Sequence, residues 1–343
     1  MSEAPIISVR NFSVDFMIST GLIRKSPLRA LKGIDLDIPR SCFFGLVGES
    51  GSGKTTFGRA LLRAAPITEG TAHYNDGELE YDLTNIQPDD LREYRKRAQL
   101  IFQDPYAALS PRMTVRDIIA EPLKVMKLTS SRAETDEKVR EIAKACRLNV
   151  EHLRRFPHAF SGGQRQRISI ARALVSNPRF VVADEAVAAL DVSIQADILN
   201  LLKRIQNETQ ATFLFISHDL SVIAQVCDFV AVMYLGQIVE TAPADKLFFE
   251  PAHPYTQALL AAIPDLDTDA KRIAPKLQGE IPSPTNRPSG CAFHTRCPYT
   301  IDICRSEEPK MESKSDGHKL VCHRWKDLPI AAESVTEGTP THD

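Results

Sequence analysis

The sequence predicts an α/β fold with a mostly parallel sheet, an antiparallel layer at the N-terminus and a small cysteine-rich tail. Three observations support this prediction. A short apolar run, residues 42–47, leads directly into a glycine-rich phosphate-binding pattern. Two further apolar runs, residues 180–183 and 213–216, end in polar residues, as buried parallel strands do where they deliver side chains to a site. Four cysteines fall within the 32 residues from 291 to 322.

Length and charge limit the classes of protein to be considered. The 343 residues are enough for two domains, or for one large domain with an appendage. Lys+Arg is 42 and Asp+Glu is 44, and the resulting net charge of -2 argues against a general nucleic-acid binder. No apolar run approaches the roughly 18 residues that span a bilayer. The N-terminus lacks the pattern of a signal peptide, so we expect a protein of the reducing cytosol.

The first segment is expected to form the antiparallel layer. Residues 6–16 alternate well enough between apolar and polar side chains to predict a half-buried strand that ends at Phe16. Residues 17–29 are basic and contain Gly and Pro, which predicts a loop, and residues 30–39 return as a second strand. At such a position Phe16 is more often a core residue than a ligand contact.

The glycine-rich stretch predicts a nucleoside triphosphate site. It matches the pattern G-x-x-x-x-G-K-[ST] without a mismatch. Its glycines let backbone N–H groups face a di- or triphosphate, and the next helix points its positive end at the same anion. Lys54 is expected on the β- and γ-phosphates and Thr55 on Mg²⁺. A chance match is disfavoured by the buried strand before the loop and the apolar helix after it. The predicted binding residues are Gly48, Glu49, Ser50, Gly51, Ser52, Gly53, Lys54, Thr55 and Thr56.

Three further strands are expected to end in chemically active side chains. Gln103 follows a strand-like run and either caps it in solvent or reaches Mg²⁺ or an attacking water. Asp184 and Glu185 are adjacent carboxylates, which need a partner charge that Mg²⁺ on the phosphates would supply. Asp184 is therefore assigned to the metal and Glu185 to the attacking water. His218, in a similar position, is either structural or a γ-phosphate contact.

The middle of the chain is expected to be helical. Residues 113–160 contain a capping box and a regular apolar face. A Ser-Gly-Gly-Gln segment then starts another helix, with its serine as N-cap and its glycines exposing backbone N–H groups. Such a helix start is by itself only a weak anion site. The residues of this segment are Ser161, Gly162, Gly163 and Gln164.

The last part of the chain changes in composition. Residues 228–240 are expected to form a hairpin that turns at Leu235 and Gly236. From residue 251 onwards, repeated prolines predict an extended segment or linker. Residues 331–343 are polar and are expected to be disordered.

The seven cysteines divide into two groups. Cys146 and Cys227 lie on apolar helix faces and are expected in the core. The four in the tail are spaced C-x5-C-x6-C-x17-C, which matches neither ferredoxin patterns nor the C-x2-4-C start of most zinc sites. Zinc, with a nearby histidine as spare ligand, is slightly favoured on chemistry alone, and free core thiols are the alternative. The residues concerned are Cys291, Cys297, Cys304 and Cys322, with His294, His318 and His323 as spare ligands.

The motifs together resemble the nucleotide-binding subunit of ATP-binding cassette (ABC) proteins. The resemblance covers residues 1 to about 245, where the motifs occur in family order; Asp191 is a further match. The tail sequences at 253–264 and 279–298 resemble the dipeptide/oligopeptide importers of bacteria. The FSGGQRQR sequence and the basic loop after the first strand resemble the second of the two paired ATPases of that subfamily.

The resemblance implies a domain organisation. A P-loop NTPase cassette would occupy residues 1–250, with a helical subdomain at about 104–175. A linker and a cysteine-rich domain would occupy residues 251–330, before the disordered tail at 331–343.

The resemblance also implies how the site works. Two ATP molecules would lie in a head-to-tail dimer, each between the phosphate loop of one subunit and residues 161–164 of the other. Phe16 would stack on adenine, Asp191 would belong to the nucleotide site, and Gln103 would couple the site to the membrane partner. Glu185 would polarise the water and His218 would hold the γ-phosphate.

Two positions depart from the family pattern. The family usually has Pro after the catalytic Glu and Ser at the start of the next loop, where this chain has Ala186 and Ala188. The missing hydroxyl removes a hydrogen bond across the dimer worth about 1 kcal/mol. We expect weaker coupling between the two sites rather than an inactive site.

The implied function is ATP hydrolysis that powers uptake of peptides at the cytoplasmic face of the plasma membrane. The implied partners are two membrane-spanning permease subunits, a paired ABC ATPase and an extracytoplasmic solute-binding protein, without nucleic acid. Nickel, glutathione or an oligosaccharide is the alternative solute, and a soluble ABC ATPase acting on ribosomes or DNA is the alternative class. The cofactors implied are ATP, Mg²⁺ and a [4Fe–4S] cluster on the four tail cysteines, with Zn²⁺ as the alternative to the cluster.

Overall fold

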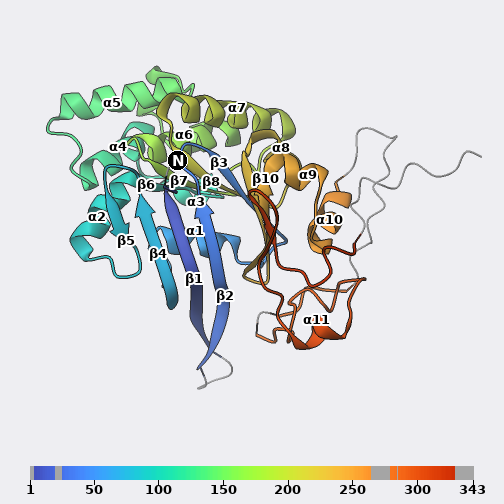
Figure 1. The fold of residues 1–343 in the computed structure, drawn as a ribbon. Helices are drawn as coiled ribbons and strands as arrows, with labels where there is room; N and C mark the ends of the chain where they lie inside the picture. The colour runs from blue at the N-terminus through green and yellow to red at the C-terminus, as the bar shows by residue number, and fades with distance from the viewer. Residues whose placement is uncertain (1–3, 20–24, 264–278, 284, 329–343) are drawn as a thin grey trace, which may run out of the picture.

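The computed structural model describes residues 4–19, 25–263, 279–283 and 285–328. These residues form two sheets, several helices and a small C-terminal lobe that lies beside the N-terminal strands (Figure 1). The predicted disorder of residues 331–343 lies outside the described residues.

The N-terminal layer is a four-stranded antiparallel sheet with the order β2-β1-β4-β5. Its strands are β1 (Ile7–Ser19), β2 (Lys25–Ile38), β4 (Glu69–Asn75) and β5 (Glu80–Asp82). The prediction that residues 17–29 form a loop is wrong, because β1 continues to Ser19 and β2 begins at Lys25. Phe16 lies opposite Leu28 and Met17 lies opposite Pro27, so cross-strand pairing outweighs the local Gly and Pro content.

The central sheet has eight strands in the order β11-β12-β10-β9-β3-β8-β7-β6. Strands β9, β3, β8, β7 and β6 run parallel to one another, and the β9–β10, β10–β12 and β11–β12 pairs are antiparallel. The strands are β3 (Phe43–Val47), β6 (Ala98–Ile101), β7 (Phe180–Asp184), β8 (Thr212–Ser217), β9 (Phe229–Tyr234), β10 (Gln237–Pro243), β11 (Glu312–Ser315) and β12 (His318–Leu320). The predicted hairpin at 228–240 is confirmed as β9 and β10.

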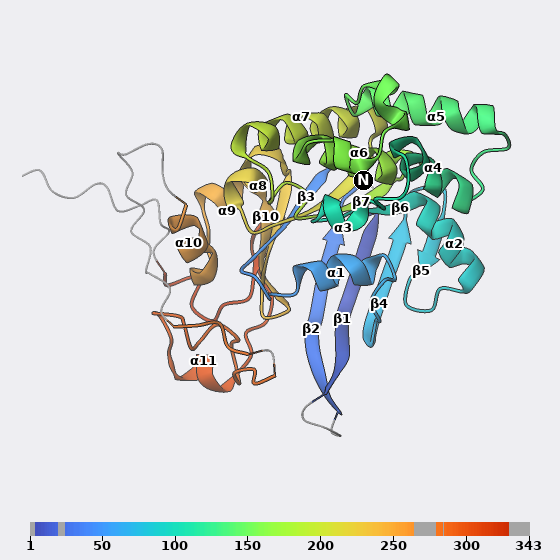
Figure 2. The same ribbon diagram turned by 180° about the vertical axis from the view of Figure 1, so that it is seen from behind.

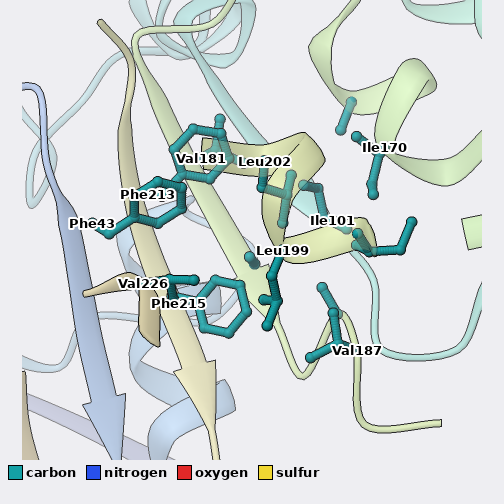
Figure 3. Close-up of a cluster of buried hydrophobic side chains, with 14 of the residues drawn as sticks. Phe43, Ile101, Ile170, Val181, Val187, Leu199, Leu202, Phe213, Phe215 and Val226 are labelled. Carbon is teal, nitrogen blue, oxygen red and sulfur yellow. The ribbon is translucent and has the colours of Figure 1, made fainter. Parts of the chain in front are cut away.

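Both faces of the central strands are buried, which explains their continuous apolar sequences. In β7, Val181 faces one apolar cluster, and Val182 faces the other. Figure 3 shows the first cluster, in which Phe43 and Phe213 stack with ring centroids 4.8 Å apart. This cluster also contains Cys146 and Cys227, so the prediction that both are core residues is confirmed.

Helices cover one face of the central sheet, and α1 lies between this sheet and the N-terminal layer (Figure 2). The helices are α1 (Lys54–Leu61), α2 (Pro88–Arg97), α3 (Pro105–Ala108), α4 (Val115–Val125), α5 (Arg132–Ala145), α6 (Gly162–Leu174), α7 (Val192–Thr209), α8 (Leu220–Val226), α9 (Ala244–Phe249), α10 (Pro254–Ala261) and α11 (Asp302–Ser306). Two 3₁₀ segments, Val150–Arg154 and Pro157–Ala159, precede α6. Within the described ranges, no helix has the length and apolar character needed to cross a bilayer.

The C-terminal segment packs on the cassette rather than extending away from it. The prediction of a linker from residue 251 is wrong for α10, which begins at Pro254 and buries Tyr255 completely. Proline is compatible with the first position of a helix because its missing N–H has no partner there. Further along, β12 pairs with β10, so the tail completes one edge of the central sheet.

Candidate nucleotide site

The phosphate loop follows β3 and brings its backbone close to the end of β9. Gly48 has φ 150°, and a Cβ atom there would lie 2.2 Å from the carbonyl oxygen of Met233. Only glycine therefore fits this approach. Gly53 has φ 109° and is the N-cap of α1, with no side chain that caps the helix. The first N–H groups of α1 are thus free to bind an anion.

Lys54 is folded into this loop. Its Nζ donates hydrogen bonds to the carbonyl oxygens of Gly48 (2.7 Å) and Glu49 (3.0 Å). Burial lowers the pKa of the ammonium group, and the nearby carboxylates Glu185 and Asp184 oppose this shift. The positive charge therefore lies inside the loop that the sequence predicts to hold phosphates.

Thr55 and Asp184 lie together, although they are far apart in the chain. The Thr55 hydroxyl donates to Asp184 Oδ1 at 2.8 Å, and Asp184 is buried. Burial raises the pKa of this carboxyl group, and the hydrogen bond from Thr55 opposes the rise. A hydroxyl and a carboxylate are the hard oxygen ligands that Mg²⁺ takes up together with substrate phosphates.

Glu185 lies between two polar side chains from neighbouring strand ends. Gln103 Nε2 donates to Glu185 Oε2 at 2.7 Å, and His218 Nδ1 is 3.3 Å from Glu185 Oε1. Gln103 follows β6, Glu185 follows β7 and His218 follows β8, so the parallel topology brings them to one edge. Glu185 also has φ 47°, a left-handed conformation that costs a non-glycine residue about 1–2 kcal/mol.

A cleft of about 440 Å³ runs over the phosphate loop. Among the residues predicted from the sequence, Phe16, Lys54, Thr55, Gln103 and Glu185 line it. Sequence reasoning missed four other residues that line this cleft, because their position comes from tertiary packing and no motif marks them. They are Leu28, Ala30, Leu235 and Arg287.

The Ser-Gly-Gly-Gln segment and Asp191 do not line the described cleft. Ser161 forms a reciprocal capping box with Gln164, and a Cβ atom on Gly163 would lie 2.5 Å from the side chain of Ile194. Asp191 is the N-cap of α7 and accepts the N–H of Ile194 at 3.0 Å. Each helix start is therefore satisfied within the chain.

The two departures from the family pattern lie directly after Glu185. Ala186 is buried, with 2 % of its surface exposed. Ala188 is exposed, and its N–H donates to the Glu185 carbonyl oxygen at 3.1 Å, which closes a tight turn. The small side chains thus accompany a turn that projects Glu185 into the cleft.

The C-terminal segment contacts the phosphate loop, which the sequence does not indicate. The N–H of Glu49 donates to Tyr255 Oη at 3.0 Å. Arg296 donates to both carboxylate oxygens of Glu49, at 2.7 and 3.2 Å. The second residue of the loop is therefore held by α10 and by the cysteine-rich lobe.

The four tail cysteines line a single cavity, together with His294 and His323. Burial raises the pKa of Cys291 to about 11 and that of Cys322 to about 12, so both are neutral thiols at pH 7 without a cation. The prediction that His318 is a spare zinc ligand is wrong. Its side chain is buried on β12 and forms a hydrogen bond with Glu240 Oε1 at 2.7 Å. Over the described residues, no group of three His, Cys, Asp or Glu is placed to hold a single metal ion.

Two family models match the chain. One, described as "ABC transporter", matches residues 31–188. The other, described as "Oligopeptide/dipeptide transporter, C-terminal region", matches residues 239–304. The similarity extends over nearly the whole chain in curated relatives. A putative peptide import ATP-binding protein of Brucella ovis is 46 % identical over 324 residues, which cover 94 % of this chain and 99 % of that protein.

The chain belongs to the ABC transporter family. The oligopeptide transport ATP-binding protein AppF of Bacillus subtilis is 42 % identical and covers 94 % of this chain and 98 % of its own length. Among solved structures, the dimeric ATP-binding cassette MJ0796 bound to ADP and Pi has a TM-score of 0.61 and 26 % identity, over 69 % of this chain and 98 % of that one. The family resemblance deduced from the motifs is therefore confirmed, as is the cassette fold.

Proposed function

We propose that this chain is the ATP-hydrolysing subunit that powers a membrane importer of peptides. One observation carries the proposal: the phosphate loop, the Thr55–Asp184 pair and the Gln103–Glu185–His218 group meet at one edge of the central sheet. The arrangement combines a phosphate cradle, oxygen ligands and a poised carboxylate, which are the parts that phosphoryl transfer to water requires.

Each of these groups has a defined role in the reaction. Lys54 and the free N–H groups at the start of α1 bind the phosphates and stabilise the charge that develops on them. Glu185 orients the attacking water and accepts its proton. Gln103 and His218 contact one Glu185 carboxylate oxygen each, and the proposed role of His218 is to hold the γ-phosphate. Phe16 stacks on the adenine base.

Mg²⁺ fits the pair formed by Thr55 and Asp184. The buried carboxylate, whose pKa is raised, is the observation that supports this assignment, because a divalent cation would stabilise the charged form. When bound, the ion neutralises charge on the phosphate oxygens. Gln103, which donates to Glu185 Oε2, is the third residue proposed to reach Mg²⁺.

The second half of each site comes from another subunit. The Ser161–Gln164 segment of one chain closes over the ATP on the phosphate loop of its partner, in a head-to-tail arrangement with a paired ABC ATPase. The separation of the Ser161 helix start from the described cleft supports this division of labour. Asp191, at the start of α7, belongs to the loop that follows Glu185 and joins the two half-sites.

The proposed setting is the cytoplasmic face of the plasma membrane. The chain works with two permease subunits and an extracytoplasmic solute-binding protein, and peptides are the solute that the names of its relatives support. The cassette takes residues 1–250, with the helical subdomain at about 104–175, and the cysteine-rich lobe takes residues 251–330.

The four tail cysteines are proposed to hold a [4Fe–4S] cluster. Four thiols around one cavity are the donor set for such a cluster, and a cluster separates its ligands more widely than a single zinc ion does. The absence of a group for a single ion in the described part of the chain therefore does not count against it. Anoxic purification should yield four iron and four sulfide per chain; Cys304→Ser should lose them and Cys42→Ser should not. Zinc in place of iron would contradict the cluster.

The function is tested by isolating the tagged chain under anoxic conditions from membranes of its host. Two multi-spanning subunits, a second cassette ATPase and a solute-binding protein from the same system should accompany it. Purified subunits should hydrolyse ATP faster when a cognate peptide is supplied with the solute-binding protein. Recovery of ribosomes or DNA-repair proteins without membrane subunits would contradict the proposal.

A further inference from the structure

An arginine of the C-terminal lobe projects into the nucleotide cleft. Arg287 lines the same cleft as Phe16 and the phosphate loop, although more than 200 residues separate it from that loop. The C-terminal lobe lies beside β2 in both views of the fold (Figures 1 and 2). The guanidinium crosses the turn between β9 and β10, where a Cβ atom on Gly236 would lie 2.8 Å from Arg287 Nη2.

Most of the hydrogen-bonding capacity of Arg287 is unused within the part of the chain that the structure describes. Nη2 donates to the carbonyl oxygen of Arg29 at 3.3 Å. Nε and Nη1 are buried and have no partner among the described residues. The nearest carboxylates have other partners: Asp15 pairs with Arg29, and Glu308 pairs with Lys32. Arg287 is half-buried, and its two buried donors without a partner are costly unless an acceptor reaches them.

The position of the guanidinium along β2 indicates which part of a nucleotide it faces. Leu28 lies opposite Phe16, which marks the base end of the cleft. The carbonyl oxygen of Ala30 lies 3.3 Å from where a Cβ atom on Gly53 would be, which marks the phosphate-loop end. Arg287 bonds the residue between these two positions. The part of ATP that joins its base to its β-phosphate is the ribose and the α-phosphate, and only the α-phosphate carries charge.

The backbone of Arg287 is held from the lobe side. Pro288 follows it, and the hydroxyl of Ser289 donates to the carbonyl oxygen of Arg305 at 2.9 Å. The N–H of Cys291 donates to the carbonyl oxygen of Cys304 at 2.9 Å. The side chain is thus presented by the lobe that contains the four tail cysteines.

We propose that Arg287 binds the α-phosphate of the nucleotide, so that the C-terminal lobe supplies part of the ATP site. This inference rests on the proposed function and adds a binding residue to it. The α-phosphate is not the phosphate that is transferred. Its role is therefore in binding ATP and ADP, not in the chemical step.

Calorimetric titration of the full chain with MgADP tests the proposal. Loss of one charge-assisted contact should weaken ADP binding by Arg287→Ala about tenfold, and Arg287→Lys should retain part of the affinity because it keeps the charge. Arg305→Ala, which removes an exposed arginine of the same lobe, is the matched control and should bind like the wild type. Without nucleotide, none of the three variants should melt below the wild type, because two donors of Arg287 are buried without a partner.

ADP analogues with sulfur on the α-phosphate locate the contact. One of the two diastereomers should bind the wild type more weakly than ADP does. In Arg287→Ala this difference from ADP should be smaller, because the contact with the α-phosphate is already missing. An equal loss in both proteins for both diastereomers would overturn the assignment to the α-phosphate. Wild-type affinity of Arg287→Ala for ADP would overturn the inference alone, whereas a wild-type chain that binds neither ADP nor ATP would overturn the proposed function as well.

Discussion

Two helix starts in this chain follow glycine-rich segments, and their polar groups are arranged in opposite ways. At α1, Gly53 is the N-cap and no side chain accepts the first N–H groups. At α6, Ser161 and Gln164 satisfy the helix start reciprocally. Because both helices have a positive N-terminal end, both favour an anion. At α1 the first N–H donors are free, whereas at α6 a ligand would have to replace the side chains that cap the helix.

This contrast supports the proposal that one chain holds only half of each site. The α1 start is surrounded by Lys54, Asp184 and Glu185, so phosphate, metal and water can be held there together. The α6 start has no such neighbours in the described cleft and is stable without a ligand. Under the proposed function, a second subunit would close the site by bringing its α6 start to the first.

Glu185→Gln should remove hydrolysis while leaving ATP binding intact. The amide cannot accept the proton of the water, and loss of a general base lowers rates by about 10²–10⁴-fold. Turnover by the assembled pair of ATPases measures the loss, and size-exclusion chromatography with ATP should show an accumulated dimer. Hydrolysis equal to that of the wild type would show that Glu185 is not the general base of the reaction.

Lys54→Ala should weaken binding of MgATP about 100-fold, because charged hydrogen bonds contribute about 1.5–3 kcal/mol. Equilibrium dialysis or calorimetry measures this affinity. Lys144→Ala, an exposed lysine on α5, is the control for loss of charge and should leave the affinity unchanged. If both variants bind ATP like the wild type, the free N–H donors of α1 bind the phosphates without help from Lys54.

A third helix start, that of α10, should be sensitive to acid. The N–H of Tyr255 donates to His253 Nδ1 at 3.0 Å, and burial lowers the pKa of His253 from 6.5 to about 4. The unfolded chain therefore binds the proton first. The stability from this cap is fully present above pH 6.5 and is lost as the pH falls towards 4. Between pH 7 and pH 5 the free energy of unfolding should fall by about 2 kcal/mol.

The variant His253→Asn tests this cap, because asparagine offers a non-titrating acceptor at an N-cap. Its free energy of unfolding in urea should fall less between pH 7 and pH 5 than that of the wild type. Equal slopes with pH in the two proteins would show that another group is responsible for the acid sensitivity.

Ser161→Ala should have the smallest effect on the isolated chain. Losing an N-cap costs about 1 kcal/mol of stability. Binding of ATP to the isolated chain should be unchanged, since α6 lies outside the described cleft, while turnover in the assembled dimer should fall. A loss of ATP binding by the isolated chain would mean that the two helix starts act on one nucleotide within one subunit.

Residues in repeating local patterns could be predicted, and residues placed by distant packing could not. Val181 and Val182 face opposite clusters, which is why their strand is continuously apolar and easily recognised. The helix that begins at Pro254 was missed because proline suggests a break and is also compatible with a helix start. Arg287 and Arg296 have no motif, because they reach the cleft and the phosphate loop only after the lobe has packed.

The pairing of β12 with the edge of β10 has a consequence for truncation. A chain ended near residue 250 would leave β10 as an unprotected template for pairing with a neighbour. It would also remove the N–H groups of Ala252 and His253 and the imidazole of His318, which bond the Glu240 carboxylate. We expect such a fragment to self-associate, because its sheet edge is open and the Glu240 carboxylate has lost these partners. The tail therefore serves the solubility of the cassette itself.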